Sequence, residues 1–230
     1  MAMRFDPAWI RPLLAGAFVV IAVPWMMREA RRPSRGLGRL FLWSMNRSHS
    51  PLTDWGLAQV AIANDAAILD VGCGGGRTIQ KLAARAAGGR VCGADISAGS
   101  VDASRATNAA RVRAGRVEVK QASVSQLPWP DATFDLVTAV ETHYYWPDPP
   151  RDLAEVRRVL KPGGTAVVIA EAYKGGSTYA AQAPFMRLVG ATLISADEHR
   201  AWFERAGFTD VQVHERRGHG WICVTGRKPL

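Results

Sequence analysis

Short apolar runs alternate with amphipathic stretches along the chain from Leu52 onward. Apolar runs that end in glycine or in a charged residue are typical of buried strands, and the stretches between them have the apolar spacing of helices. The pattern predicts strands at residues 66–71, 90–95, 117–122, 134–141, 165–170, 211–214 and 221–225. It predicts helices at residues 78–87, 98–113, 152–160 and 196–205, with Ser97 as the N-cap of the second.

The alternation of strand and helix indicates an α/β fold, in which a mostly parallel sheet has helices on both faces. Residues 211–214 and 221–225 have no helical stretch between them, so they predict a closing antiparallel pair. A further helix is expected near the start of this region, with Ser50 as its N-cap and Pro51 as its first residue. No internal repeat or low-complexity linker interrupts residues 38–230, which therefore form one domain.

The N-terminal residues 1–37 have a different character. Residues 12–27 are apolar and uncharged and would reach roughly 24 Å as a helix, somewhat less than the roughly 30 Å hydrocarbon core of a bilayer. A signal peptide is disfavoured because no small-residue cleavage site follows, and a helix buried in the domain is an alternative. The arginines after the run and the flanking Trp9 and Trp25 favour a membrane anchor. We therefore expect membrane association through residues 9–40, with the domain in the cytoplasm or on the cytoplasmic face of the membrane.

Composition and charge exclude several classes of protein. The 230 residues are 48% hydrophobic and 21% charged, which excludes a disordered or fibrous chain. The cysteines Cys73, Cys92 and Cys223 are too few and too scattered for a disulfide framework or a thiolate zinc site. Seven arginines and two acids lie in residues 1–40, so more than half of the formal charge of +9 belongs there. Because the basic excess lies outside the domain, a nucleic-acid partner is not expected.

A glycine-rich turn follows the first predicted strand, in the sequence Ile-Leu-Asp-Val-Gly-Cys-Gly-Gly-Gly at residues 68–76. In open α/β sheets ligands bind beyond the carboxyl ends of the strands, and glycines allow a ligand to lie against the backbone. A dinucleotide site needs a third glycine at the position of Arg77, so that fingerprint fails. Asp70 beside the turn favours a cationic ligand such as S-adenosylmethionine, and Asp95 can accept hydrogen bonds from ribose hydroxyls. The alternative is that the glycines only form a turn and the aspartates cap helices.

The sequence resembles the class I S-adenosylmethionine-dependent methyltransferases over residues 38–228. Residues 68–76 match their first motif, Asp95 matches their ribose-binding acid, and residues 127–137 and 157–164 are similar to their segments before the fourth and fifth strands. The likeness is greatest to small-molecule methyltransferases of the type that methylates quinones and sterols at carbon. It implies a doubly wound, mostly parallel, seven-stranded sheet of the Rossmann-like methyltransferase type. It also implies S-adenosylmethionine as the cofactor, bound by Asp70, Gly72, Cys73, Gly74, Asp95, Ile96, Ala122, Ser123 and Glu141.

Two features of the cofactor residues depart from, or extend, this pattern. Many members place an aspartate after the third strand to bind adenine, and this chain has Ser123, which accepts a hydrogen bond without a charge. Glu141 follows the fourth strand and is expected to be a cofactor or structural contact rather than a base.

The segment after the fourth strand faces the transferred methyl group in the family that the chain resembles. Here it reads Glu-Thr-His-Tyr-Tyr-Trp-Pro at residues 141–147. His143 is the expected general base because the pKa of histidine is near neutrality, and Tyr144 is the second expected catalytic residue. We expect the acceptor pocket to include Asn46, His49, Tyr145, Trp146 and Tyr173. The alternative is that the aromatic residues are packing and His143 is a surface or hydrogen-bonded residue.

Residues 175–194 are interpreted as an inserted cap whose Phe185, Met186 and Leu188 could shape that pocket. His199, His214 and His219 have no metal-ligand spacing, so no metal is expected and they are interpreted as structural or solvated.

Together these features predict an enzyme that transfers a methyl group to a small-molecule acceptor of apolar or amphipathic character. A second interpretation is a methyltransferase for a membrane lipid or a quinone. A third is a catalytically silent module that binds S-adenosylmethionine and acts through a partner. The chain lacks the Asn-Pro-Pro-Tyr segment of enzymes that methylate flipped nucleobases, which again argues against a nucleic-acid acceptor.

Overall fold

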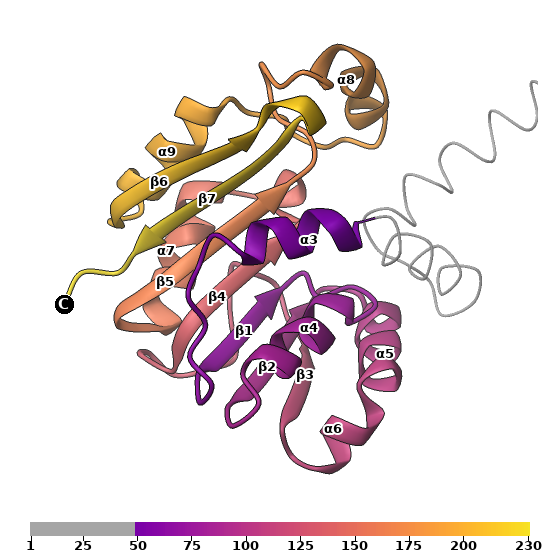
Figure 1. Ribbon diagram of the computed structural model, residues 1–230, viewed down its shortest axis with the longest axis vertical. Helices are drawn as coiled ribbons and strands as arrows, with labels where there is room; N and C mark the ends of the chain where they lie inside the picture. Colours follow the sequence, from indigo (N-terminus) through magenta and orange to yellow (C-terminus); the bar gives the residue numbers. More distant parts are fainter. Residues whose placement is uncertain (1–48) are drawn as a thin grey trace, which may run out of the picture.

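The computed structural model describes residues 49–230, which form a single seven-stranded sheet with helices on both faces (Figure 1). The predicted N-terminal anchor at 9–40 and the pocket residue Asn46 lie outside the described residues. The strands are β1 Ala67–Val71, β2 Arg90–Asp95, β3 Val117–Gln121, β4 Phe134–Val140, β5 Leu160–Ala170, β6 Thr209–Arg216 and β7 Trp221–Arg227. The helices are α3 Ser50–Leu57, α4 Arg77–Arg85, α5 Ala98–Thr107, α6 Ala109–Arg113, α7 Pro149–Val159, α8 Tyr179–Leu188 and α9 Ala196–Arg205, with short 3₁₀ helices η2 His143–Tyr145 and η3 Arg217–His219.

The strand order is β3-β2-β1-β4-β5-β7-β6. β1 to β5 pair in parallel, whereas β7 pairs antiparallel with both β5 and β6. This confirms the predicted doubly wound sheet and its antiparallel closing pair. The strand order reverses between β1 and β4, so their carboxyl ends meet at the place where open α/β sheets bind ligands.

Alternate residues of the inner strands enter two separate hydrophobic cores, one on each face of the sheet. In β1, Ile68 packs with residues of α3 and α4, whereas Leu69 packs on the opposite face with residues of α7 and α9. Both side chains are fully buried. The continuous apolar runs of the sequence therefore reflect strands that are covered on both sides.

The described helices differ from the predicted ones at two informative places. The stretch 98–113, predicted as one helix, is divided at Asn108 into α5 and α6. The buried Asn108 side chain donates hydrogen bonds to the carbonyl oxygens of Gly76 (3.0 Å) and Ser104 (3.1 Å), so the division supports the glycine turn. The predicted cap of the first helix was wrong, because α3 begins at Ser50 and His49 occupies the N-cap position. Ser97 is confirmed as the cap of α5, since its hydroxyl accepts a hydrogen bond from the Ser100 N–H.

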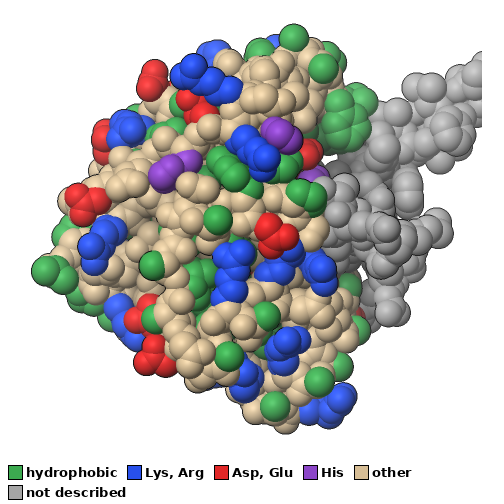
Figure 2. Space-filling model, viewed as in Figure 1, with side chains coloured by type: hydrophobic (Ala, Val, Ile, Leu, Met, Phe, Trp, Pro, Cys, Tyr) green, Lys and Arg blue, Asp and Glu red, His purple; other side chains and the backbone are tan. Residues whose placement is uncertain are grey.

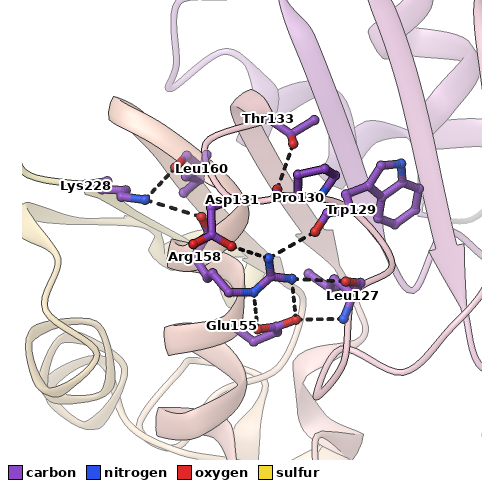
Figure 3. Close-up of polar contacts among 9 residues, drawn as sticks. All are labelled: Leu127, Trp129, Pro130, Asp131, Thr133, Glu155, Arg158, Leu160 and Lys228. Carbon is purple, nitrogen blue, oxygen red and sulfur yellow. Dashed lines mark hydrogen bonds and ion pairs between the residues drawn. The ribbon is translucent and has the colours of Figure 1, made fainter.

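Arg158 of α7 joins the two sequence motifs that precede β4 and β5 (Figure 3). Its guanidinium donates to the carbonyl oxygens of Leu127 and Trp129 and forms ion pairs with Asp131 and Glu155. Glu155 in turn accepts a hydrogen bond from the Leu127 N–H at 2.8 Å. These motifs are therefore structural: they fix the chain at the amino end of β4, opposite the end at which ligands bind.

The surface over α3 and α4 carries basic and acidic side chains close together (Figure 2), and Lys81 of α4 forms an ion pair with Asp54 of α3. Within residues 49–230, no helix is both long enough and apolar enough to cross a membrane.

Candidate functional site

The glycine turn after β1 is tight and lies directly against the segment that follows β4. The N–H groups of Gly72 and Cys73 both donate to the Ala94 carbonyl oxygen, at 2.8 and 3.0 Å. Gly72 has φ +70°, and a Cβ there would lie 2.1 Å from the Thr142 hydroxyl oxygen. A side chain at this position would therefore meet both backbone strain and a steric clash.

Asp95, at the end of β2, holds its carboxylate beside this turn. One oxygen accepts a hydrogen bond from the Gly74 N–H at 2.9 Å, and the other accepts one from the Ser97 N–H at 2.8 Å. Burial raises the pKa of Asp95, although the two backbone N–H groups act in the opposite direction. Each carboxylate oxygen can accept a further hydrogen bond, so a ribose can bind without breaking these contacts.

The other predicted cofactor residues on this side surround Asp95. The Ala122 N–H donates to the Asp95 carbonyl oxygen at 3.0 Å, which places Ser123 at the end of the neighbouring strand β3. The Ser123 hydroxyl oxygen accepts a hydrogen bond from the Ser125 N–H at 3.2 Å. Ile96 is 43% exposed, unusually so for a large apolar residue in this domain. The structure therefore brings together an acid, a hydroxyl and an apolar surface, which are the groups that a nucleoside requires.

Asp70 is the buried acid of β1, with 1% of its surface exposed. Its partner is the Thr138 hydroxyl of β4, which donates a hydrogen bond of 2.8 Å. Burial, together with the charge of Asp95, raises the pKa of Asp70 to about 7 although the Thr138 hydrogen bond opposes this shift. A buried carboxylate without a cationic partner is costly, so a cationic ligand in the adjacent turn would stabilise its ionised form.

Glu141 connects the ends of β4 and β5. It has φ +57°, and its Oε1 accepts hydrogen bonds from the Glu171 N–H at 2.5 Å and from the Tyr144 hydroxyl at 3.2 Å. The Tyr144 hydroxyl itself accepts a hydrogen bond from the Ala172 N–H at 3.1 Å. Burial, followed by the charge of Glu171, raises the pKa of Glu141 to about 7. Positive φ in a non-glycine residue is uncommon and is often found at functional sites.

His49 reaches this pair of acids from the start of α3. Its Nε2 lies 3.4 Å from Glu171 Oε1, and ligand atoms of His49, Glu141 and Glu171 all lie within 4.8 Å of one another. The sequence predicted His49 in the acceptor pocket but not its pairing with Glu171. The available signal was the position of Glu171, a charged residue directly after a long apolar strand.

His143, the predicted general base, is buried, with 2% of its surface exposed. Its Nε2 lies 3.0 Å from Nε2 of His199 in α9, and its ring packs on the Tyr144 ring. His199 Nδ1 lies 2.8 Å from the Ser195 carbonyl oxygen and so carries the proton there, which leaves His199 Nε2 to accept a hydrogen bond from His143. Burial lowers the pKa of His143 well below its ordinary value. The structure therefore places His143 in the packing between η2 and α9, which disfavours the role of base.

The predicted pocket residues fall into two groups. Trp146 is 9% exposed, and Tyr173 is 3% exposed and donates its hydroxyl proton to Glu215 of β6 at 2.6 Å, so both belong to the packed interior. Tyr145 is partly buried and packs edge-on against Tyr144. In the predicted cap, Phe185 and Leu188 are exposed, whereas Met186 is buried.

Residues 69–168 match the family described as "Methyltransferase domain". The chain is 26% identical over 187 residues to the "Uncharacterized methyltransferase YdaC" of Bacillus subtilis, covering 80% of this chain and 96% of that protein. It is 30% identical over 163 residues to "2-methyl-6-phytyl-1,4-hydroquinone methyltransferase 1, chloroplastic" of Oryza sativa subsp. japonica, covering 71% of this chain and 47% of that protein. The chain thus spans about half the length of this second relative.

Among solved structures, the fold is similar to that of the S-adenosylmethionine-dependent methyltransferase SibL. The TM-score is 0.71 with 25% sequence identity, over 85% of this chain and 60% of that chain. Residues 69–168, which match the methyltransferase family, contain the glycine turn, Asp95 and Glu141.

Proposed function

Since the chain belongs to the class I S-adenosylmethionine-dependent methyltransferases, we propose that it transfers a methyl group from S-adenosylmethionine to a small acceptor of apolar or amphipathic character. The observation that carries this proposal is the pair of buried acids, Asp70 and Asp95, at either side of a turn in which a Cβ at Gly72 would clash with Thr142. S-adenosylmethionine supplies a methyl group bound to a sulfonium, which departs as a neutral thioether.

The described residues fit this donor. Asp70 would stabilise a nearby positive charge, Asp95 would accept hydrogen bonds from the ribose, and Ile96 would pack against the base. A diphosphate fits poorly, because two carboxylates at the turn would repel it. A dinucleotide contains such a diphosphate, so the two carboxylates favour S-adenosylmethionine over a dinucleotide.

The negative charge at the carboxyl ends of β4 and β5 limits the kind of acceptor that can bind there. Glu141 and Glu171 lie at the carboxyl ends of β4 and β5, where they disfavour an anionic acceptor such as a phosphorylated headgroup. Tyr144 and Tyr145 supply aromatic surface after β4. A quinol is therefore the second candidate acceptor, and the named hydroquinone methyltransferase relative supports it.

A membrane-bound acceptor would be consistent with the sequence of residues 9–40, through which we propose that the protein associates with the cytoplasmic face of the membrane. The test is sedimentation of the full chain with anionic vesicles. Replacing the arginines at 28–39 by glutamine should strongly reduce sedimentation, because these arginines are expected to attract the anionic lipid headgroups. Unchanged sedimentation, or none with the natural sequence, would contradict this association.

Transfer of a labelled methyl group into a cell extract tests the function itself. We expect label from S-adenosylmethionine to appear in the organic phase with the natural protein and to be lost in Asp95→Ala. Label confined to polar small molecules would contradict the apolar acceptor. Absence of label, despite calorimetric binding of S-adenosylhomocysteine, would instead identify a catalytically silent binding module.

A further inference from the structure

Three separate elements bring His49, Glu141 and Glu171 together at the carboxyl ends of the strands. α3 lies across the sheet with its amino end near the ends of β4 and β5 (Figure 1), so His49 faces Glu171. The His49 side chain is 19% exposed and that of Glu171 is 36% exposed. Unlike His143, this histidine is accessible from solvent.

The contacts within this cluster leave His49 able to accept a proton. Its Nε2 is directed to Glu171, and no described residue is hydrogen-bonded to its Nδ1. Burial lowers the pKa of His49, but the hydrogen bond with Glu171 and the charge of Glu141 outweigh burial and raise the pKa above its ordinary value. Proton transfer by a general base is most effective when the pKa of the base is near the operating pH, and a histidine of this type meets that condition near neutrality.

Tyr144 is less suited to this task. Its hydroxyl already donates to Glu141 and accepts from the Ala172 N–H, and burial raises its pKa well above the ordinary value. Glu141 Oε1 is likewise occupied by two donors. Of the titratable groups in the cluster, the His49 imidazole therefore combines access with unused hydrogen-bonding capacity.

We propose that His49 is the catalytic base of the methyl transfer, that Glu171 is its positioning residue, and that the acceptor presents a phenolic or enolic hydroxyl. This inference rests on the proposed function. The acceptor oxygen forms a bond to the methyl carbon while the bond from that carbon to sulfur breaks, and the electron pair of the broken bond remains on the sulfur. The hydroxyl proton passes to Nδ1 of His49, and the carboxylate of Glu171 stabilises the resulting imidazolium.

The same three residues also have the geometry and chemistry to hold a divalent cation, since one histidine and two carboxylates are suitable ligands. Two observations favour the proton instead. His49 and Glu171 already form a pair at 3.4 Å, and Glu141 Oε1 already accepts two hydrogen bonds. A metal requirement is thus a separate outcome that the experiment must reveal.

The test compares phenols of different acidity as probes. 4-Methoxyphenol is un-ionised at about pH 8 and needs a base, whereas 4-nitrophenol is largely ionised there and does not. We expect His49→Gln to lower the transfer rate to 4-methoxyphenol by about 10²- to 10³-fold. The loss with 4-nitrophenol should be less than about tenfold, with unchanged affinity for S-adenosylmethionine. The matched control is His219→Gln, an exposed histidine outside the site, which should leave both rates unchanged.

Glu171→Gln separates positioning from simple packing. Without the carboxylate, the pKa of His49 should fall, so the acidic limb of the rate profile should shift to lower pH, and Glu171→Asp should restore part of the difference. NMR titration of the His49 imidazole, assigned by its absence in His49→Gln, measures the same shift without any acceptor. An unchanged titration in Glu171→Gln would overturn the role of Glu171.

Equal losses with both phenols in His49→Gln would overturn the base. Activity that disappears after chelation and returns with Mg²⁺ or Mn²⁺ would overturn proton transfer in favour of a metal. Transfer to extract components but to no phenol would overturn the hydroxyl acceptor while leaving the proposed function intact. Failure to bind S-adenosylmethionine would contradict the proposed function itself.

Discussion

Two pairs of acids lie at the carboxyl ends of the strands, and they are held in different ways. At the cofactor end, defined by Asp70, Gly72 and Asp95, each carboxylate has its own nearby donors, from Thr138 or from backbone N–H groups. At the acceptor end, defined by His49, Glu141 and Glu171, the carboxylates and the imidazole face one another. The first arrangement fixes charges for a ligand, whereas the second lets neighbouring groups share a proton. The two ends should therefore respond differently to substitution and to pH.

The largest expected effect is at Gly72. A Cβ there would clash with Thr142, and positive φ adds strain, each costing on the order of 1–3 kcal/mol. The turn should therefore leave the position that the ligand requires, and Gly72→Ala should lower affinity for S-adenosylmethionine by at least about 100-fold, measured by calorimetry. The matched control is Gly115→Ala, where φ is also +70° but nothing lies within 4 Å, and affinity should not change. Equal effects at the two glycines would show that strain alone matters.

Asp95 should have the next largest effect. Asp95→Ala removes the ribose acceptor and also the contacts with the Gly74 and Ser97 N–H groups. We expect a roughly 10- to 100-fold loss of affinity for S-adenosylmethionine, since the loss of one hydrogen bond to a charged group costs about 1.5–3 kcal/mol. Ser123→Ala, which removes one uncharged acceptor, should cost less. Wild-type affinity in Asp95→Ala would place the ribose elsewhere.

The difference between the two ends also determines how much could be predicted from sequence. Asp70 and Gly72 are neighbours in the chain, and Asp95 ends the next strand, so a local pattern and the sheet topology were enough to bring them together. His49 and Glu171 are far apart in sequence, and their contact depends on how α3 crosses the sheet. No linear pattern carries that information.

His143 illustrates a second limit. A histidine after an apolar strand is typical of a base, but the short helix η2 turns this side chain toward α9. Its partner His199 lies in a helix that the sequence predicted correctly, and of the two interpretations given to His199, structural or solvated, its burial fits the first. Which side of a short turn a residue faces depends on tertiary packing, and spacing could not reveal it.

A smaller effect concerns pH at the cofactor end. With a pKa raised to about 7, Asp70 is partly protonated in the free protein near neutrality, whereas a cationic ligand favours its ionised form. Binding of S-adenosylmethionine should therefore release protons, and affinity should fall as pH decreases below about 7, by at most about tenfold per pH unit. Calorimetry in buffers of different ionisation enthalpy measures the released protons.

Asp70→Asn provides the control for this pH dependence, because it keeps the Thr138 contact but cannot ionise. Proton release that persists in this variant would assign it to another group, with Glu141 of the acceptor end as the alternative, since its pKa is also raised to about 7.

The smallest effect near neutral pH is expected from the buried histidines. Burial lowers the pKa of His199 to about 4 and also lowers that of His143, against an unfolded value of 6.5. Between these pH values the unfolded state binds more protons than the folded state. The free energy of unfolding should therefore decrease as pH falls from 6.5 toward about 4. Thermal unfolding followed across this range measures the decrease.

The double variant His143→Leu/His199→Leu tests both the stability and the role of His143. Replacing both hydrogen-bonding partners by apolar groups of similar shape is nearly neutral, and it removes a buried His143 Nδ1 that has no hydrogen-bond partner within residues 49–230. The Ser195 carbonyl oxygen loses the ring N–H of His199 but keeps its hydrogen bond from the backbone N–H of residue 199. We therefore expect a flatter stability profile in acid, with methyl transfer within about threefold of the natural protein, because the base lies at His49. A large loss of transfer with an intact fold would return the catalytic role to His143 and remove the distinction between the two ends of the site.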